Sequence, residues 1–226
     1  MTRTAAVIVA AGAGSRFGGA KQFAPFGGRP LFEWSCEVFQ AHPGVDDIIL
    51  VLPETPTRVL DPGRFSKIVD IVPGGERRQD SVAAGFARLD PERTGFVLVH
   101  DGARPLLGPE LIDRVLAGAK KTGAAVPVVP PEDTIKEIFE GRVLRTLDRG
   151  RWGRVQTPQG FAYAVLRRAL NRASADGFTG TDESILVERL GLEVAAVDGD
   201  PRNLKITTPL DLLFAEAVRH ENRLGF

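Results

Sequence analysis

Short uninterrupted hydrophobic runs alternate along the chain with segments whose hydrophobic residues have helical spacing. The runs lie at residues 5–11, 48–52, 68–72, 96–100 and 124–129. A run of this kind is typical of a strand buried on both faces of a parallel sheet. Helical spacing lies between the runs, at residues 31–41, 81–89 and 109–121. Because strand and helix alternate, the pattern predicts an α/β fold: a Rossmann-like, mostly parallel sheet with helices on both faces.

Several residues mark where helices begin. Pro109 suits the first turn of its helix, where no backbone N–H is required. We expect Asp80 or Ser81 to cap the helix that ends near residue 89. We also expect Thr181 to cap a later helix, with the acidic residues after it favourable to the helix dipole. Towards the C-terminus the pattern predicts helices at residues 164–173, 182–190 and 209–221, and a strand at residues 192–197.

The segment at residues 131–151 departs from this alternation. Two strand-like stretches, residues 134–139 and 143–147, flank Glu140-Gly141. This arrangement predicts a β-hairpin. The hairpin is too polar for the core, so we expect it to project as an arm from a single domain of residues 1–226. Its hydrophobic side would need a cover, and a partner subunit is one candidate.

Composition narrows the function. Lys plus Arg and Asp plus Glu both total 29, so the formal net charge is zero. Such a chain has no general attraction for nucleic acid or an anionic membrane, and any basic site must be local. Cys36 is the only cysteine, which excludes an internal disulfide, and its hydrophobic neighbours predict a core position. No hydrophobic run approaches transmembrane length and no leader is evident, so we expect a cytoplasmic protein.

A glycine-rich loop follows the first predicted strand. Glycines there let backbone N–H groups approach phosphate oxygens. The spacing does not fit a P-loop, because Lys21 is followed by Gln22, nor a dinucleotide fingerprint, because Phe17 stands where glycine is required. Two cations, Arg16 and Lys21, are what such a loop needs to stabilise charge on a phosphoryl group under attack. The competing interpretation is a surface turn with two solvated cations.

A second candidate site follows the predicted strand at residues 96–100. Ligands of open α/β sheets bind at the carboxyl ends of strands. Asp101 is therefore placed to hold Mg²⁺ and Arg104 to bind a phosphate, although the two could instead form a local ion pair. We expect His100 to be structural, because a phosphate nucleophile needs no general base.

Two further sets of residues carry weaker signals. The turn at residues 74–81 could offer backbone groups to a base or ribose, while Arg77 and Arg78 could equally be solvated. Thr134, Arg149 and Lys205 would each be an ordinary surface residue if considered singly.

Taken together, these segments resemble a known family over residues 5–214. The matching segments are AAGAGSRFGGAKQF, GGERRQDSV, VHDGARP, PPEDTIK, TLDRGRW, QTPQGF, TDES and NLKIT. Their order resembles that of the 2-C-methyl-D-erythritol 4-phosphate cytidylyltransferases of the non-mevalonate isoprenoid pathway. The resemblance implies a nucleotidyltransferase that transfers CMP from CTP to 2-C-methyl-D-erythritol 4-phosphate, giving 4-diphosphocytidyl-2-C-methyl-D-erythritol and pyrophosphate. It further implies Mg²⁺ as cofactor and a homodimer in which the arm reaches the neighbouring active site.

The resemblance also implies a role for each matching residue. Arg16 and Lys21 would stabilise the α-phosphate in the transition state, and Asp101 would lie near the metal. The implied CTP-binding residues are Ala10, Ala11, Gly12, Gly75 and Ser81. The residues implied around the acceptor phosphate are Arg104, Thr134, Arg149 and Lys205. This chain departs from the family at Ala20, where proline is usual, and at Gly102, where alanine is usual; the first departure predicts a more mobile loop.

Four other functions remain open at this point. A sister enzyme would use CTP with another polyol phosphate, such as ribitol 5-phosphate, and would differ around the acceptor. A broader relative would use UTP or GTP with a sugar phosphate. A non-catalytic module would bind CTP without turnover, against which the pair of loop cations argues. A dinucleotide-dependent oxidoreductase is disfavoured by the loop spacing.

Overall fold

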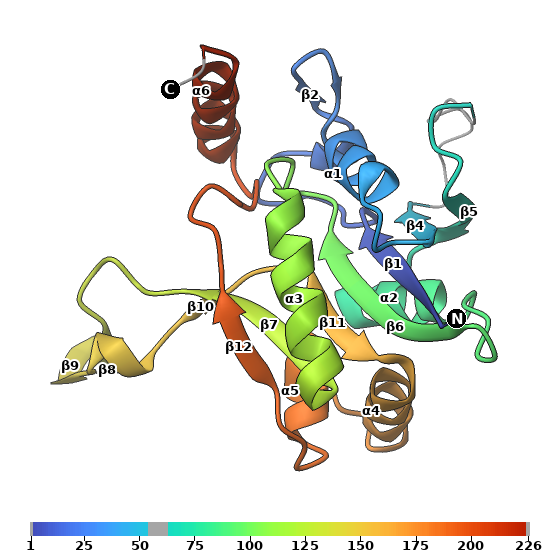
Figure 1. Ribbon diagram of the computed structural model, residues 1–226. Coiled ribbons are helices and arrows are strands. Elements are labelled where there is room, and N and C mark those ends of the chain that lie inside the picture. The colour runs from blue at the N-terminus through green and yellow to red at the C-terminus, as the bar shows by residue number, and fades with distance from the viewer. Residues whose placement is uncertain (1, 54–62, 225–226) are drawn as a thin grey trace.

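An eight-stranded sheet forms the centre of the molecule in the computed structural model, which describes residues 2–53 and 63–224 (Figure 1). The strands are β1 (Arg3–Val9), β2 (Pro25–Phe26), β3 (Arg29–Pro30), β4 (Asp47–Leu52), β5 (Ile68–Pro73), β6 (Thr94–Asp101), β7 (Ala124–Val129), β8 (Lys136–Phe139), β9 (Arg142–Thr146), β10 (Arg154–Val155), β11 (Gln159–Ala162) and β12 (Ala195–Asp198). The helices are α1 (Leu31–Ala41), α2 (Arg78–Phe86), α3 (Pro109–Thr122), α4 (Tyr163–Ala175), α5 (Ser184–Glu188) and α6 (Pro209–Leu224), with short 3₁₀ turns at Lys21–Phe23 and Arg149–Arg151. The expected single domain of residues 1–226 includes residues 1, 54–62 and 225–226, which lie outside the described part.

The sheet is mostly parallel, as predicted. Its order is β10-β7-β11-β6-β1-β4-β5, with β12 paired to β7. Strands β6, β1, β4 and β5 run parallel, and every hydrophobic run singled out in the sequence forms one of the sheet strands. The antiparallel strands β10 and β11 were not predicted. They are short and contain polar or glycine residues, so neither of them gives a recognisable hydrophobic run.

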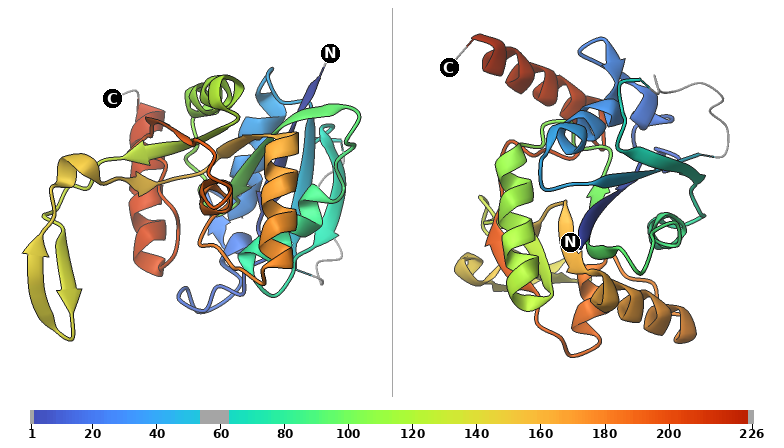
Figure 2. Two further views of the ribbon diagram at one scale, coloured as in Figure 1. Left: turned by 90° about the horizontal axis from the view of Figure 1, so that it is seen from below. Right: turned by 45° about the vertical axis from the view of Figure 1, so that its right-hand side comes forward.

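Helices cover both faces of the sheet (Figure 2). Alternate residues of β1 point to opposite faces, as strand geometry requires. Val7 packs in the core with α2, α4 and α5, whereas Ile8 packs in the core with α1 and α3. Cys36 is fully buried in the second of these cores, as predicted, and its burial raises the pKa of the thiol.

Two of the predicted helix caps are wrong. Helix α2 begins at Arg78, so Asp80 and Ser81 lie inside it. Asp80 acts from the first turn instead, where its carboxylate accepts the Arg77 N–H at 3.1 Å. Helix α5 begins at Ser184, and its first turn is capped by Asp182 rather than Thr181, because the Asp182 carboxylate accepts the Ile185 N–H at 3.1 Å. Pro109 does occupy the first turn of α3, as predicted.

The predicted hairpin is present as β8 and β9, and it projects from the body of the molecule (Figures 1 and 2). Glu140 and Gly141 both have positive φ, 48° and 75°, as a tight hairpin turn of this kind requires. The hydrophobic side chains of the arm are exposed in the single chain, with Ile138 at 64% and Phe139 at 62%.

Helix α6 lies at the same end of the molecule as the segment that carries Lys205. Thr208 and Asp211 form a capping box at its start: Thr208 Oγ1 accepts the Asp211 N–H at 3.3 Å and Asp211 accepts the Thr208 N–H at 2.7 Å. Ile206 and Ala215 pack in a small separate core with Phe26. These contacts fix the position of Lys205 next to the sheet.

Candidate active site

A cavity of about 310 Å³ opens at the carboxyl ends of β1 and β6. Ligands of open α/β sheets bind at this edge. Most of the residues that the sequence assigned to the nucleotide, loop and metal line this cavity: Ala10, Ala11, Gly12, Lys21, Gly75, Ser81 and Asp101. Lys205, assigned to the acceptor phosphate, lines it as well. The fold therefore brings together segments from both ends of the chain.

The turn before α2 packs tightly against this cavity. A Cβ on Gly74 would lie 2.1 Å from the Cβ of Ala11, and a Cβ on Gly75 would lie 2.4 Å from that of Asp80. Only glycine allows this close approach. The Ser81 hydroxyl accepts the Gly75 N–H at 3.1 Å. Ser81 thus fixes the turn whose backbone lines the cavity.

Part of the glycine-rich loop is ready to receive an anion. The carbonyl of Gly14 accepts hydrogen bonds from the amides at residues 17–19 and closes the outer turn. The amides of Gly12, Ala13 and Ser15, in contrast, make no hydrogen bond with any described residue. Free amides after a strand are suitable donors to phosphate oxygens.

The two loop cations lie in different surroundings. Lys21 lines the cavity, and its Nζ donates to the carbonyl of Ile206 at 2.7 Å. Burial, and then the positive charge of Lys205, lower the pKa of Lys21. Arg16 is exposed, does not line the cavity, and forms no hydrogen bond or ion pair within residues 2–53 and 63–224. Its predicted catalytic role stays a prediction.

Asp101 is the centre of a buried group of charges. Its carboxylate accepts from Arg78 Nε at 2.8 Å and from Lys205 Nζ at 2.6 Å, and Arg104 Nε lies 3.9 Å away. Burial opposes ionisation of Asp101, but Arg78, Lys205 and Arg104 outweigh it and hold the pKa of this carboxyl well below its usual range. Asp101 is therefore a fixed negative charge among cations.

A second cavity of about 240 Å³ adjoins the first, because Lys205 lines both. Arg104 lies in its wall, almost fully buried, and donates from Nη1 to the carbonyl of Asn203 at 2.8 Å. Its Nε is buried without a hydrogen-bond partner among the described residues. Lys205 and Arg104, both assigned to the acceptor phosphate, thus lie side by side, as their assignment requires.

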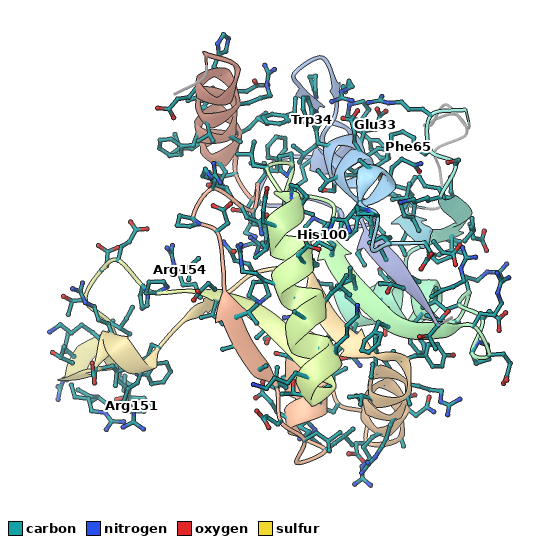
Figure 3. The ribbon with its side chains drawn as sticks, viewed as in Figure 1. Glu33, Trp34, Phe65, His100, Arg151 and Arg154 are labelled. Carbon is teal, nitrogen blue, oxygen red and sulfur yellow. The ribbon has the colours of Figure 1, made fainter. Side chains whose placement is uncertain are left out.

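The other two residues assigned to the acceptor phosphate lie outside these two cavities. Thr134 and Arg149 are exposed at the root of the arm, and neither lines the first or the second cavity. The Arg149 guanidinium donates to the carbonyl of Glu132 at 2.9 Å. Figure 3 shows Arg154 where the arm joins the sheet, Arg151 beside the hairpin, and His100 in the middle of the molecule.

His100 belongs to a buried chain of hydrogen bonds that fixes the turn at residues 101–104. The Ser35 hydroxyl donates to the Arg104 carbonyl at 3.1 Å, so its oxygen accepts from His100 Nε2, 3.2 Å away. Nδ1 of a neutral His100 then accepts from Thr157 Oγ1 at 3.1 Å, and Thr157 accepts the Asp101 N–H at 3.0 Å. Burial lowers the pKa of His100 to about 3, so the ring is neutral and structural, as predicted.

Sequence reasoning missed two residues of this site. By its sequence Arg78 could equally be solvated, yet it lines the cavity and bonds to Asp101. Glu183 is expected only to favour a helix dipole, yet its carboxylate accepts from Arg78 Nη1 at 2.8 Å on both oxygens. The only signal in the sequence is that Glu183 follows a polar, glycine-containing segment, and this signal does not show that its partner is Arg78.

The donor set around Asp101 fits a metal ion only in part. Within the described residues, no three His, Cys, Asp or Glu side chains come together as a metal site. Mg²⁺ is commonly held by one or two carboxylates together with substrate phosphates. A single carboxylate therefore suits an ion that arrives with a triphosphate, and does not suit a resident metal.

No helix in the described part is long and hydrophobic enough to cross a membrane.

Comparison with known proteins identifies the family of this chain. The sequence model described as 2-C-methyl-D-erythritol 4-phosphate cytidylyltransferase matches residues 4–221. The enzymes of that name from Dehalococcoides mccartyi (strain 195) and Syntrophotalea carbinolica are 45% and 42% identical, covering 98% and 93% of this chain and 98% and 94% of theirs. The crystal structure of that enzyme from Thermus thermophilus aligns over 95% of this chain and 98% of its own with a TM-score of 0.80 and 36% identity. The chain therefore belongs to the 2-C-methyl-D-erythritol 4-phosphate cytidylyltransferase family.

Proposed function

We propose that this protein transfers CMP from CTP to 2-C-methyl-D-erythritol 4-phosphate, giving 4-diphosphocytidyl-2-C-methyl-D-erythritol and pyrophosphate. The observation that carries the proposal is the pair of adjoining cavities that share Lys205. One has a backbone-lined wall and free loop amides for a nucleotide, and the other has Arg104 for a second phosphate. Their junction is where two anionic substrates would meet.

The reaction needs charge placement more than proton transfer. A phosphate oxygen of the acceptor attacks the α-phosphorus of CTP, a new P–O bond forms, and the bond to the departing pyrophosphate breaks. The nucleophile is already an anion, so no covalent enzyme intermediate and no general base are required. Lys21, Lys205 and Arg104 reduce the repulsion between the substrates, and Arg16 would add to this if the loop closes over CTP.

Mg²⁺ is the proposed cofactor. Asp101 would hold it together with the triphosphate oxygens, and the ion would neutralise charge on the departing pyrophosphate. In this role the cations around Asp101 matter, because they hold the pKa of this carboxyl well below its usual range and so favour the ionised form that binds a metal ion.

We further propose a cytoplasmic homodimer, without nucleic-acid or membrane partners, in which the arm of one subunit completes the site of the other. The support is that Thr134 and Arg149 lie outside both cavities of their own chain. The arm also carries exposed hydrophobic side chains at Ile138, Phe139 and Leu144, which a second copy would cover.

The reaction is tested by pyrophosphate release with Mg²⁺ and matched substrate panels. We expect release with CTP and 2-C-methyl-D-erythritol 4-phosphate, and little with UTP, GTP or ribitol 5-phosphate. Release only with ribitol 5-phosphate would move the enzyme to the sister reaction. Binding of CTP without release under any condition would contradict the catalytic proposal.

Sharing of sites between subunits is tested by mixing two variants. In a mixed dimer of Lys21→Ala and Arg149→Ala, one site would carry both defects and the other would be intact. At an acceptor concentration far below the KM of the Arg149→Ala variant, random pairing should therefore restore about one quarter of the wild-type rate, if the arm acts on the neighbouring site. No restoration in a mixture shown to contain mixed dimers would mean that each arm serves its own chain.

A further inference from the structure

Glu183 is a buried carboxylate that lies away from the two cavities proposed to bind the substrates. Its side chain is 1% exposed, and it lines neither of the two cavities. Both carboxylate oxygens accept from Arg78 Nη1, and the Nε of the same guanidinium donates to Asp101. Arg78 therefore lies between two carboxylates, one inside the protein and one in the wall of the cavity.

The position of Glu183 is fixed by a side chain from the sheet. Gln159, on β11, accepts the backbone N–H groups of Glu183 at 3.2 Å and Ser184 at 3.3 Å. The amide nitrogen of Gln159 donates to Asp182 at 2.9 Å. Strand β11 pairs with β6, the strand that ends at Asp101. Glu183 is thus anchored to the same sheet that positions Asp101.

A buried carboxylate is unfavourable unless it is paired. Burial raises the pKa of Glu183, and the charge of Arg78 opposes that rise. Hydrophobic residues at both positions 78 and 183 would avoid this cost, so stability alone does not account for the pair of charges. The geometry provides another reason: Glu183 occupies Nη1 of Arg78 and leaves Nε directed at Asp101.

We propose that Glu183 is a positioning residue for nucleotidyl transfer, holding the Arg78 guanidinium against Asp101 so that Asp101 faces Lys205 and the first cavity in one orientation. The proposal rests on the proposed function. Without Glu183, Arg78 keeps a single carboxylate partner. It is then free to turn into the cavity that it lines, where a phosphate would compete with Asp101 for it.

The first test is Glu183→Gln, which keeps the shape of the side chain and removes its charge. Loss of a group that orients another typically costs about 10–100-fold, and we expect kcat to fall by roughly this factor. The cavity would become more positive, so KM for CTP should stay the same or decrease. The matched control is Glu188→Gln, which removes an exposed acid at the end of the helix that Glu183 precedes and should leave both parameters unchanged.

The second test separates positioning from a purely structural role. Arg78→Met should lower kcat at least as far as Glu183→Gln does, and the double variant should be no worse than Arg78→Met alone, because Glu183 acts only through Arg78. Additive losses in the double variant would overturn the proposal. So would wild-type kinetics in Arg78→Met, which stays informative even if Glu183→Gln fails to fold.

The two proposals can fail separately. An inactive wild-type protein would contradict the proposed function. An active wild-type protein whose folded Glu183→Gln variant, checked by circular dichroism and thermal unfolding, has an unchanged kcat would contradict only the role of Glu183.

Discussion

The wall of the cavity and the arm are both rich in charged residues, but they hold those residues in different ways. At the wall, Asp101 is almost fully buried and contacts Arg78 and Lys205 at 2.8 and 2.6 Å. On the arm, the pair of Arg145 and Glu137 is exposed, with the arginine at 71%. Exposed pairs contribute about 0–1 kcal/mol, whereas a buried network fixes geometry strongly. The wall is therefore organised within one chain, while the arm is organised only as a hairpin.

This difference indicates that the wall and the arm contribute to different parts of the proposed reaction. The wall of the first cavity is complete within one chain, so in the proposed mechanism it can bind the nucleotide before the arm of a second chain contributes. The arm carries Arg149 on a solvated projection, so its contribution to the site depends on what it docks against. Variants in the two regions should accordingly change different kinetic parameters.

The largest effect is expected at the wall. Lys21→Ala removes a cation from the cavity and should lower kcat by ~10²–10³, about 3–4 kcal/mol in the barrier, because the charge of the transition state loses a preorganised donor. Steady-state kinetics with saturating substrates measures this. A folded variant with a near-normal kcat would show that the glycine-rich loop does not take part in the mechanism.

A smaller effect is expected on the arm. Arg149→Ala should raise KM for the acceptor by roughly 10–100-fold, the value of a hydrogen bond to a charged group, with CTP binding unchanged. The control is Arg142→Ala, an exposed cation near the hairpin turn. Weaker CTP binding with a normal acceptor KM would show that the arm serves the nucleotide side instead.

The hydrogen-bonded chain through His100 predicts a dependence of stability on pH. The pKa of His100 is lowered from 6.5 to about 3, so below pH 6.5 the unfolded chain binds a proton that the folded protein resists. The free energy of unfolding should therefore fall by up to about 1.4 kcal/mol for each pH unit between 6.5 and 3, from this residue alone. His100→Asn should be less stable at pH 7 by about 1–2 kcal/mol and should have a flatter pH profile. The free energy of unfolding of both proteins is measured by urea titration across this pH range. The same pH dependence in the variant and the wild type would contradict this account.

The smallest effect is expected at the hairpin turn. Glu140 has a φ of 48°, which asparagine tolerates better than glutamate. Glu140→Asn should stabilise the arm by about 0.5 kcal/mol, seen as slower hydrogen exchange of the β8 and β9 amides, with CTP binding unchanged. Faster exchange would indicate that the arm is held by something other than its own turn.

The sequence alone determined most of the fold. Hydrophobic runs at residues 5–11 and 124–129 required a sheet buried on both faces, and Glu140-Gly141 between strand-like stretches required a hairpin. These signals are local, since each depends on the solvation and backbone preference of a few consecutive residues. The short strands β10 and β11 have no such signal: β11 is a strand because it pairs between β6 and β7, and β10 because it pairs with β7 on the other side.

The sequence also determined the identity of most residues that line the first cavity, through the motifs that follow β1 and β6. It did not determine which charges meet. Arg78 and Glu183 are 105 residues apart in the chain, and the partner of a charged side chain depends on which segments the sheet brings together. Burial then decides the outcome: the same arginine would be solvated on an open turn, but in the wall of this cavity it needs both Glu183 and Asp101. Tertiary structure alone placed Arg78 in the wall of the cavity with Glu183 behind it, and left Thr134 and Arg149 outside.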